Sequence, residues 1–190
     1  MPRDAESTRR RIFDAATAEF TAHGIAGARI DRISAAAGAN KQLIYAYFGN
    51  KRALFEAVVS EHVTRFLEAV PFDADDLPAY AAAMFDFHVA HSEIAQLGAW
   101  HALEPGESEH RIPVIEQAIK SRTRAIAQAQ ERGAVTDRLK AGDVLTLVGS
   151  IASAWAVATP EREPRAPVGA RTIAARRAAV AEAVRRLVAP

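Results

Sequence analysis

The segment from Gly24 to Leu54, GIAGARIDRISAAAGANKQLIYAYFGNKRAL, decides the fold of the N-terminal part of the chain. It predicts two short helices, over residues 30–37 and 41–48, separated by Gly38-Ala39-Asn40. Glycine can adopt the positive φ that ends a helix, and the Asn40 side chain can cap the helix that follows. Two short helices joined by such a turn form a helix-turn-helix, whose second helix fits the major groove of DNA. The alternative is an ordinary three-helix bundle without a DNA partner.

The second helix carries polar and aromatic side chains that its own packing does not need. Leu43, Ile44 and Phe48 supply its apolar anchor. Gln42, near the helix N-terminus, can pair with adenine through two hydrogen bonds, and Lys41 can donate to guanine or to phosphate. Two tyrosines beside these residues indicate a surface with a partner, because exposed aromatic area generally has a use.

Arg29 lies just before the first of the two helices, where a cation opposes the helix dipole at a cost of about 0.3–1 kcal/mol. Asp31 offsets part of this cost, and a bound phosphate would explain the arginine more fully. Tyr45, Tyr47 and Lys51 are placed for phosphate oxygens. Any one of Lys41, Gln42 or Tyr47 could instead touch only backbone or solvent. The residues predicted to contact DNA are Arg29, Asn40, Lys41, Gln42, Tyr45, Tyr47 and Lys51.

Apolar residues recur at spacings of three and four along almost the whole chain, which predicts an all-α protein of about nine helices. We expect an N-terminal helix-turn-helix head over residues 1–50 and a helical body over residues 51–190. Ile112, Ile115, Ile119 and Ile126 form one apolar stripe in the body. Further helices are expected over about residues 7–23, 51–70, 141–158 and 170–188. Asp75 or Asp76 can cap another helix with Pro78 in its first turn, Ser92 can cap one that stops at Pro105-Gly106, and a long helix with the isoleucine stripe ends at Gly133.

Composition excludes several classes of protein. The chain has no cysteine, so disulfides, thiolate metal sites and thiol nucleophiles are absent, as in a reducing cytosol. Residues 1–52 hold nine Lys/Arg against five Asp/Glu, which suits a head that binds a polyanion, although solvated helix faces would look similar. No stretch has the 18 or so apolar residues that a membrane span needs, and residues 1–11 lack the apolar core of a signal peptide. We therefore expect a cytoplasmic protein with no membrane partner.

These residues together resemble the TetR family of bacterial transcriptional regulators, over roughly the first 55 positions. Four positions depart from the usual family pattern, at Ala28-Arg29, Ala39-Asn40, Gln42 and Arg52, so the operator sequence does not carry over. The residues that carry the resemblance are Ala37-Gly38, Asn40, Ile44-Tyr45-Ala46-Tyr47-Phe48 and Lys51 to Leu54, preceded by Ile12, Ala15, Ala16, Phe20 and Gly24.

The resemblance implies a homodimer that represses its target by binding a palindromic operator in double-stranded DNA and that releases it when a small-molecule effector binds. It implies that the last two helices form the dimer contact, which fits the small residues of segment 141–158. No enzyme activity, cofactor or metal is expected. The identities of the operator and the effector, and the choice between repression and activation, stay open.

The body contains aromatic and basic residues that could form the wall of an effector pocket. A mixed apolar and polar lining is typical of small-ligand sites, although large aromatics are more often plain core. His88 and His91, with His101, could alternatively bind a metal or serve acid–base chemistry. Arg122 could neutralise an anionic effector if it faces inward, but exposure to solvent is its ordinary fate. The candidate ligand-binding residues are Phe85, His88, Trp100, His101, Arg122 and Trp155.

Overall fold

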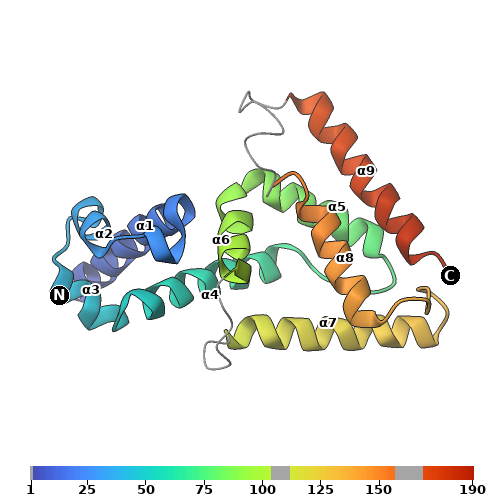
Figure 1. The fold of residues 1–190 in the computed structure, drawn as a ribbon, viewed down its shortest axis with the longest axis horizontal. Helices are drawn as coiled ribbons and strands as arrows, with labels where there is room; N and C mark the ends of the chain where they lie inside the picture. The colour runs from blue at the N-terminus through green and yellow to red at the C-terminus, as the bar shows by residue number, and fades with distance from the viewer. Residues whose placement is uncertain (1, 104–111, 157–168) are drawn as a thin grey trace. The chain divides into compact units, whose positions relative to one another are not determined.

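The computed structural model describes residues 2–103, 112–156 and 169–190, and these ranges contain helices and no strand (Figure 1). The prediction of an all-α protein is confirmed. The helices are α1 (Pro2–Gly27), α2 (Ile30–Ala37), α3 (Lys41–Phe48), α4 (Lys51–Ala69), α5 (Leu77–Ala90), α6 (Ser92–Leu103), α7 (Pro113–Glu131), α8 (Ala141–Ser153) and α9 (Ala170–Val188).

The chain packs as two compact units. The first holds Met1–Thr64 with Glu93–Ile112, and the second holds Arg65–Ser92 with Pro113–Pro190. Helix α4 therefore contributes to both units, and α6 packs with the N-terminal helices although it follows α5 in the sequence. The expected boundary between a DNA-binding head (residues 1–50) and a body (residues 51–190) is a statement about function, and it stays a prediction.

The core of the first unit lies where α1, α2 and α3 meet the first turns of α4. Ile12 and Phe20 from α1 are fully buried, as are Ile33 from α2 and Leu54 from α4. The Phe20 ring meets the Phe55 ring edge to face, with the ring centroids 5.1 Å apart. Burial of side chains of this size stabilises by about 1.5–3 kcal/mol each, so this cluster fixes the short α2 and α3.

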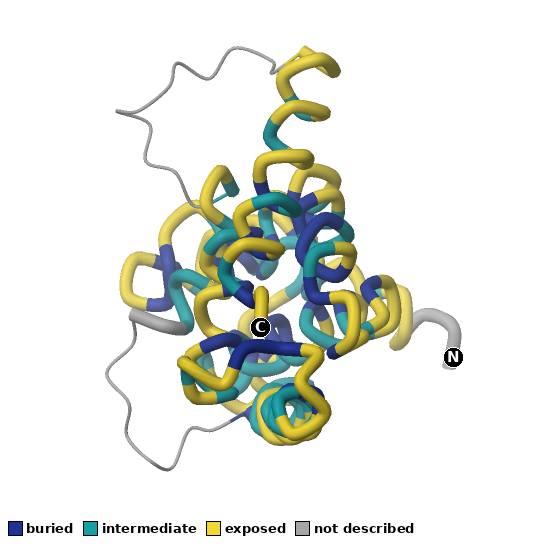
Figure 2. Tube along the Cα trace, turned by 90° about the vertical axis from the view of Figure 1, so that its right-hand side faces the viewer, coloured by how far each residue is buried: buried dark blue, intermediate teal, exposed yellow. Residues whose placement is uncertain are grey.

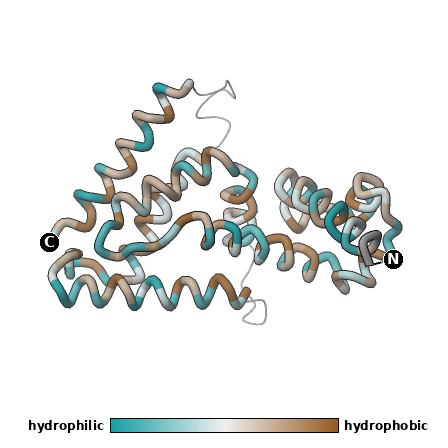
Figure 3. The backbone as a smooth tube through the Cα atoms, turned by 180° about the vertical axis from the view of Figure 1, so that it is seen from behind, coloured by the Kyte–Doolittle hydropathy of each residue, from teal (hydrophilic) through white to brown (hydrophobic). Residues whose placement is uncertain are grey.

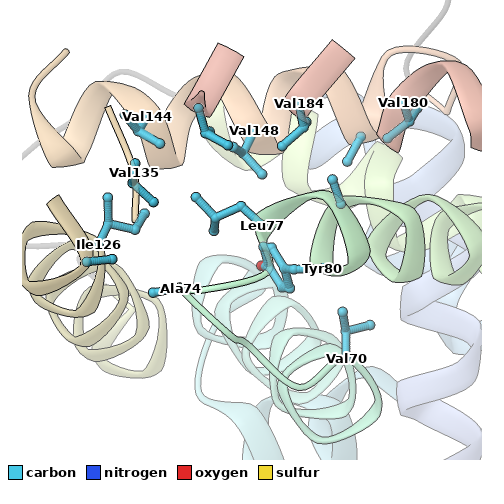
Figure 4. Close-up of a cluster of buried hydrophobic side chains, with 14 of the residues drawn as sticks. Val70, Ala74, Leu77, Tyr80, Ile126, Val135, Val144, Val148, Val180 and Val184 are labelled. Atoms are coloured by element: carbon cyan, nitrogen blue, oxygen red, sulfur yellow. The ribbon is translucent and has the colours of Figure 1, made fainter. Parts of the chain in front are cut away.

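The core of the second unit is built around α5, which packs against both α8 and α9. Figure 4 shows Leu77 of α5 pointing toward a row of valines. That row comes from two helices, with Val144 and Val148 on α8 and Val180 and Val184 on α9, and all are 1% exposed or less. Figure 3 shows hydrophilic and hydrophobic segments alternating along α7 and α9, as expected for helices buried on one face.

Several boundaries differ from the expectations. Helix α1 begins at Pro2 rather than Ser7, and it continues to Gly27 across a kink at Gly24, where φ is 62° and ψ is 178°. Helix α8 ends at Ser153, so Trp155 lies in the turn that follows it and is 39% exposed. The end expected for the sixth helix at Pro105-Gly106 falls outside the described residues.

The isoleucine stripe of α7 is only partly buried. Ile126 is fully buried, but Ile119 is 52% exposed. The buried residues of α7, Ile126 and Ala129, lie in its C-terminal half, which packs in the core of the second unit. Within the described residues, the N-terminal half of α7 contributes no residue to that core. Figure 2 shows exposed residues along the first turns of α9 as well.

No helix in the described ranges is long and apolar enough to cross a membrane.

Candidate functional site

The turn before α3 has the chemistry that the sequence predicts. Gly38 adopts the left-handed conformation, with φ 58° and ψ 38°, and so ends α2. The Asn40 side-chain oxygen accepts a hydrogen bond from the Leu43 N–H at 2.7 Å, which caps the N-terminus of α3. The start of α3 is therefore fixed by local hydrogen bonds as well as by the burial of Ile44.

One face of α3 points away from the core of the first unit. Lys41, Gln42, Tyr45 and Ala46 are exposed, whereas Ile44 is buried. Tyr45 exposes 45% of its surface. This face offers a cation, an amide and a phenol on a rigid helix of eight residues, which is the set of donors and acceptors that base edges and phosphates require.

Lys41 forms an ion pair with Asp31 of α2, so the two helices are linked across the turn. The hydrogen bond from Lys41 holds the pKa of the Asp31 carboxyl below its usual value, and the same bond raises the pKa of Lys41. Both side chains are more than half exposed. Water and salt therefore weaken the pair, and a phosphate can compete with Asp31 for the ammonium group.

Glu19 of α1 is a residue that the sequence analysis missed. Its Oε1 accepts the backbone N–H of Arg29 at 2.8 Å and the Nε of Arg32 at 2.7 Å. This carboxylate adds a second negative charge, beside that of Asp31, near the N-terminus of α2, so no phosphate is needed to explain Arg29. Burial acts to raise the pKa of Glu19, but the hydrogen bonds from Arg32 and Arg29 and the positive charge of Arg32 outweigh it, and the pKa lies below its ordinary value.

Two of the residues predicted to contact phosphates, Lys51 and Tyr47, have hydrogen-bond partners in the protein's own backbone. The Nζ of Lys51 donates to the carbonyl oxygen of Ala28 at 3.1 Å, and the Tyr47 hydroxyl lies 3.5 Å from the carbonyl oxygen of Ala5. Lys51 thus connects the start of α4 to the residue before Arg29. Contact of Lys51 and Tyr47 with DNA stays a prediction.

The arginine run of α1 flanks the helix-turn-helix. The Arg9 guanidinium lies 5.7 Å from the centroid of the Phe48 ring at the end of α3. Arg11 reaches the turn at the other end of α3, where its Nη1 would lie 3.4 Å from a Cβ at Gly38. The sequence analysis did not select these residues, although three consecutive arginines were a visible signal.

Two of the candidate ligand residues, Trp100 and His101, belong to the first unit. The Trp100 indole N–H donates to the carbonyl oxygen of Thr21 at 3.2 Å, and its ring covers Gly24, where an added Cβ would come within 2.9 Å of ring carbons. The His101 ring stacks on Phe55, with the centroids 6.4 Å apart. Helix α6 is therefore attached to α1 and α4 through these two rings.

The second unit brings three of the candidate ligand residues together. Phe85, His88 and Trp155 line one pocket, together with Ile173 and Arg176 of α9 and three smaller contacts. Arg122 does not line this pocket: its guanidinium lies 5.3–5.5 Å from the ring centroids of Phe66, Phe72 and Tyr80, so it is partly covered rather than solvated. Among the described residues, no group of three or more His, Asp or Glu could hold a metal ion.

Comparison with known proteins gives one consistent answer. Residues 12–58 match the family profile described as bacterial regulatory proteins of the tetR family, and residues 76–186 match the profile of the tetracyclin repressor-like C-terminal domain. The chain is 46% identical over 160 residues to the transcriptional repressor SCO4008 of Streptomyces coelicolor, covering 84% of this chain and 83% of that protein. It is 34% identical over 109 residues to the repressor NicS of Pseudomonas putida, covering 54% and 51%.

The solved structures agree. The structure of the protein SCO4942 of Streptomyces coelicolor matches with a TM-score of 0.79 at 35% identity. The match covers 95% of this chain and 98% of the SCO4942 chain. FadR of Bacillus subtilis, solved with stearoyl-CoA, has a TM-score of 0.71 at 14% identity, with 95% and 99% covered, and shows the fold alone. The C-terminal profile covers more than half of this chain, and the head carries the exposed α3 face. The chain therefore belongs to the TetR family and is a DNA-binding transcriptional regulator.

Proposed function

We propose that this protein is a ligand-released repressor, which binds a palindromic operator as a homodimer in the bacterial cytoplasm. Each protomer inserts α3 into the major groove, with Gln42 reading a base edge and Lys41 exchanging Asp31 for a phosphate or a guanine. Tyr45 and Tyr47 of α3 contact the backbone of the DNA, as do Arg29 and Lys51, which lie on either side of α3 in the sequence. The observation that carries the proposal is the exposed polar face of α3 on a helix whose position is fixed by its cap and core.

The dimer contact is assigned to α8 and α9. Thr146, Leu147 and Ser150 are exposed on α8, and Leu147 exposes 39% of its surface. Small side chains allow two helices to approach closely, so such faces suit packing against a second copy. Helix α9 adds an exposed set of alanines, at Ala174, Ala175, Ala178, Ala179 and Ala183. Two heads held in this way would meet DNA about one helical turn apart.

The experiment begins by selecting tight-binding duplexes from a random pool with the wild-type protein. Fluorescence anisotropy then compares the selected operator with a scrambled duplex for three proteins, the wild type, Gln42→Ala and the control Gln128→Ala. Loss of a bidentate base contact costs about 1–3 kcal/mol, so Gln42→Ala should weaken operator binding about 5- to 150-fold and leave scrambled binding unchanged. Gln128 is exposed on α7, and its replacement should change neither.

Lys51→Ala should weaken binding to both duplexes alike, because it removes a cation and frees the loop at Ala28. Light scattering of the complex should show two chains on each operator duplex. Equal losses on both duplexes for Gln42→Ala, or a selected site without two-fold symmetry, would contradict the proposal.

A further inference from the structure

The second unit contains a pocket of about 300 Å³ between α5, the turn after α8, and α9. Its walls are mostly apolar: the Phe85 and Trp155 rings meet edge to face, with the centroids 6.1 Å apart, and Val89, Ala156 and Ile173 complete them. A cavity of about 150 Å³ holds one benzene molecule, so this space is suited to a ligand with two fused aromatic rings. Aromatic walls at edge-to-face geometry favour a flat aromatic ligand over a branched aliphatic one.

The pocket offers little to an ionic ligand. No acidic residue is among its described lining residues, so a bound cation would meet no counter-charge there. Arg176 is the one cationic residue of the described lining, and its guanidinium lies 5.4 Å from the centroid of the Trp155 ring. A bound anion could pair with the N–H groups of that guanidinium, but it would exchange the rest of its water for apolar walls. An uncharged ligand avoids both costs.

His88 is one of three polar or charged residues in the described lining, with Ser92 and Arg176. The residue is 8% exposed, and its Nδ1 is buried with no hydrogen-bond partner among the described residues. Burial lowers the pKa of His88, so the imidazole is neutral at pH 7. A ligand hydroxyl can donate to the ring nitrogen that faces the pocket or accept from it, so it suits either tautomer of the imidazole.

We propose that this pocket is the effector site and that it binds an uncharged, flat aromatic molecule with a hydroxyl group directed at His88. The proposal rests on the proposed function for its regulatory meaning, but binding itself does not require DNA. Trp100, His101 and Arg122 do not line this pocket and are not part of the site.

The test uses 2-naphthol as the probe, with isothermal titration calorimetry on the full-length protein in the absence of DNA. Three matched compounds separate the contributions: naphthalene lacks the hydroxyl, 2-naphthoate is an anion, and 2-naphthyltrimethylammonium is a cation. The expected order places 2-naphthol tightest, about tenfold over naphthalene, which is the yield of one hydrogen bond, and places both ions below naphthalene. Tighter binding of either ion than of 2-naphthol would overturn the assignment of ligand class.

Two variants locate the site. His88→Phe keeps an aromatic ring of similar size and should abolish the preference for 2-naphthol over naphthalene, and Ala156→Trp should fill the pocket and lower the affinity for both by more than tenfold. His91→Phe, three residues along the chain and outside the lining, is the matched control and should keep the preference. Circular dichroism melting checks that each variant folds. Unchanged 2-naphthol affinity in a folded Ala156→Trp would overturn the site.

A second measurement separates this inference from the proposed function. Anisotropy with the selected operator, without any probe, reports DNA binding alone. If the wild type binds the operator but does not bind 2-naphthol, the pocket assignment is refuted and the repressor proposal stands. If it binds 2-naphthol but no operator, the repressor proposal is refuted and the pocket assignment stands. With both intact, 2-naphthol should release the operator from the wild type at lower concentration than from His88→Phe. Equal release would overturn the role of His88.

Discussion

Removal of the Glu19 carboxylate should destabilise the helix-turn-helix, because this group connects α1 to the N-terminus of α2. In Glu19→Ala the Arg29 N–H and the Arg32 guanidinium lose a shared charged acceptor, at 2.8 and 2.7 Å. A hydrogen bond to a charged group contributes about 1.5–3 kcal/mol, and the Arg32 side chain is 44% exposed, so solvent reduces its share. We expect a loss of about 2 kcal/mol in the free energy of unfolding.

Urea denaturation at pH 7, followed by circular dichroism at 222 nm, measures this loss. Glu19→Gln should lose less than Glu19→Ala, because the amide oxygen still accepts the Arg29 N–H. Glu131→Ala is the matched control, since Glu131 is exposed at the end of α7, and it should stay within about 0.5 kcal/mol of the wild type. A loss below about 0.5 kcal/mol in Glu19→Ala would refute the reasoning that this carboxylate fixes α2.

The same interaction predicts a dependence on pH. The pKa of Glu19 is lowered in the folded protein from its ordinary value of about 4.5, so the unfolded chain takes up a proton before the folded chain does. The stability contributed by Glu19 is therefore complete above pH 4.5 and is lost as the pH falls through the folded pKa. The difference in unfolding free energy between the wild type and Glu19→Gln should be constant from pH 7 to about 5 and shrink below that.

Two further predictions concern other parts of the molecule. Gly24→Ala should lower the unfolding free energy by about 2 kcal/mol or more in urea titrations, because φ at this position is 62° and the new Cβ would lie 2.9 Å from Trp100. Gly98→Ala is the control and should not destabilise the protein, because a Cβ there meets nothing within 4 Å. Equal effects of the two substitutions would rule out this account. Burial lowers the pKa of His88, so the unfolded state accepts a proton at a higher pH than the folded state does. The unfolding free energy of the wild type relative to His88→Phe should therefore be constant above about pH 6.5 and fall as the pH drops below it. A difference that does not change with pH from 8 to 5 would contradict a neutral buried imidazole.

The head could be predicted because its signals are local. Gly38 and Asn40 fix the turn through their own backbone and side-chain preferences, and both behave in the structure as predicted. Glu19 could not be predicted, because it lies ten residues before the Arg29 N–H that it accepts, and only the packing of α1 on α2 brings them together. The same holds for Lys51, whose partner Ala28 is 23 residues away.

Predictions for the body were less complete, since an apolar or aromatic residue carries no information about which neighbour it meets. Trp100 and Phe85 looked alike in sequence as parts of one pocket wall. In the structure Trp100 covers Gly24 of α1, whereas Phe85 packs against Trp155. Ile119 fits the same stripe as Ile126 and is nevertheless exposed, because the periodicity defines a face of α7 but not how far along the helix a neighbour extends.

The sequence by itself determined that this protein is helical and carries a helix-turn-helix with Lys41, Gln42 and Tyr45 on the outer side of the second helix, since periodicity, caps and turn glycines act within a few residues. The tertiary structure alone decided which distant groups meet: the carboxylate that caps α2, the ring that closes over Gly24, and the pocket around His88. Those contacts depend on how whole helices pack, and packing is set by the fit of many side chains at once rather than by any local pattern.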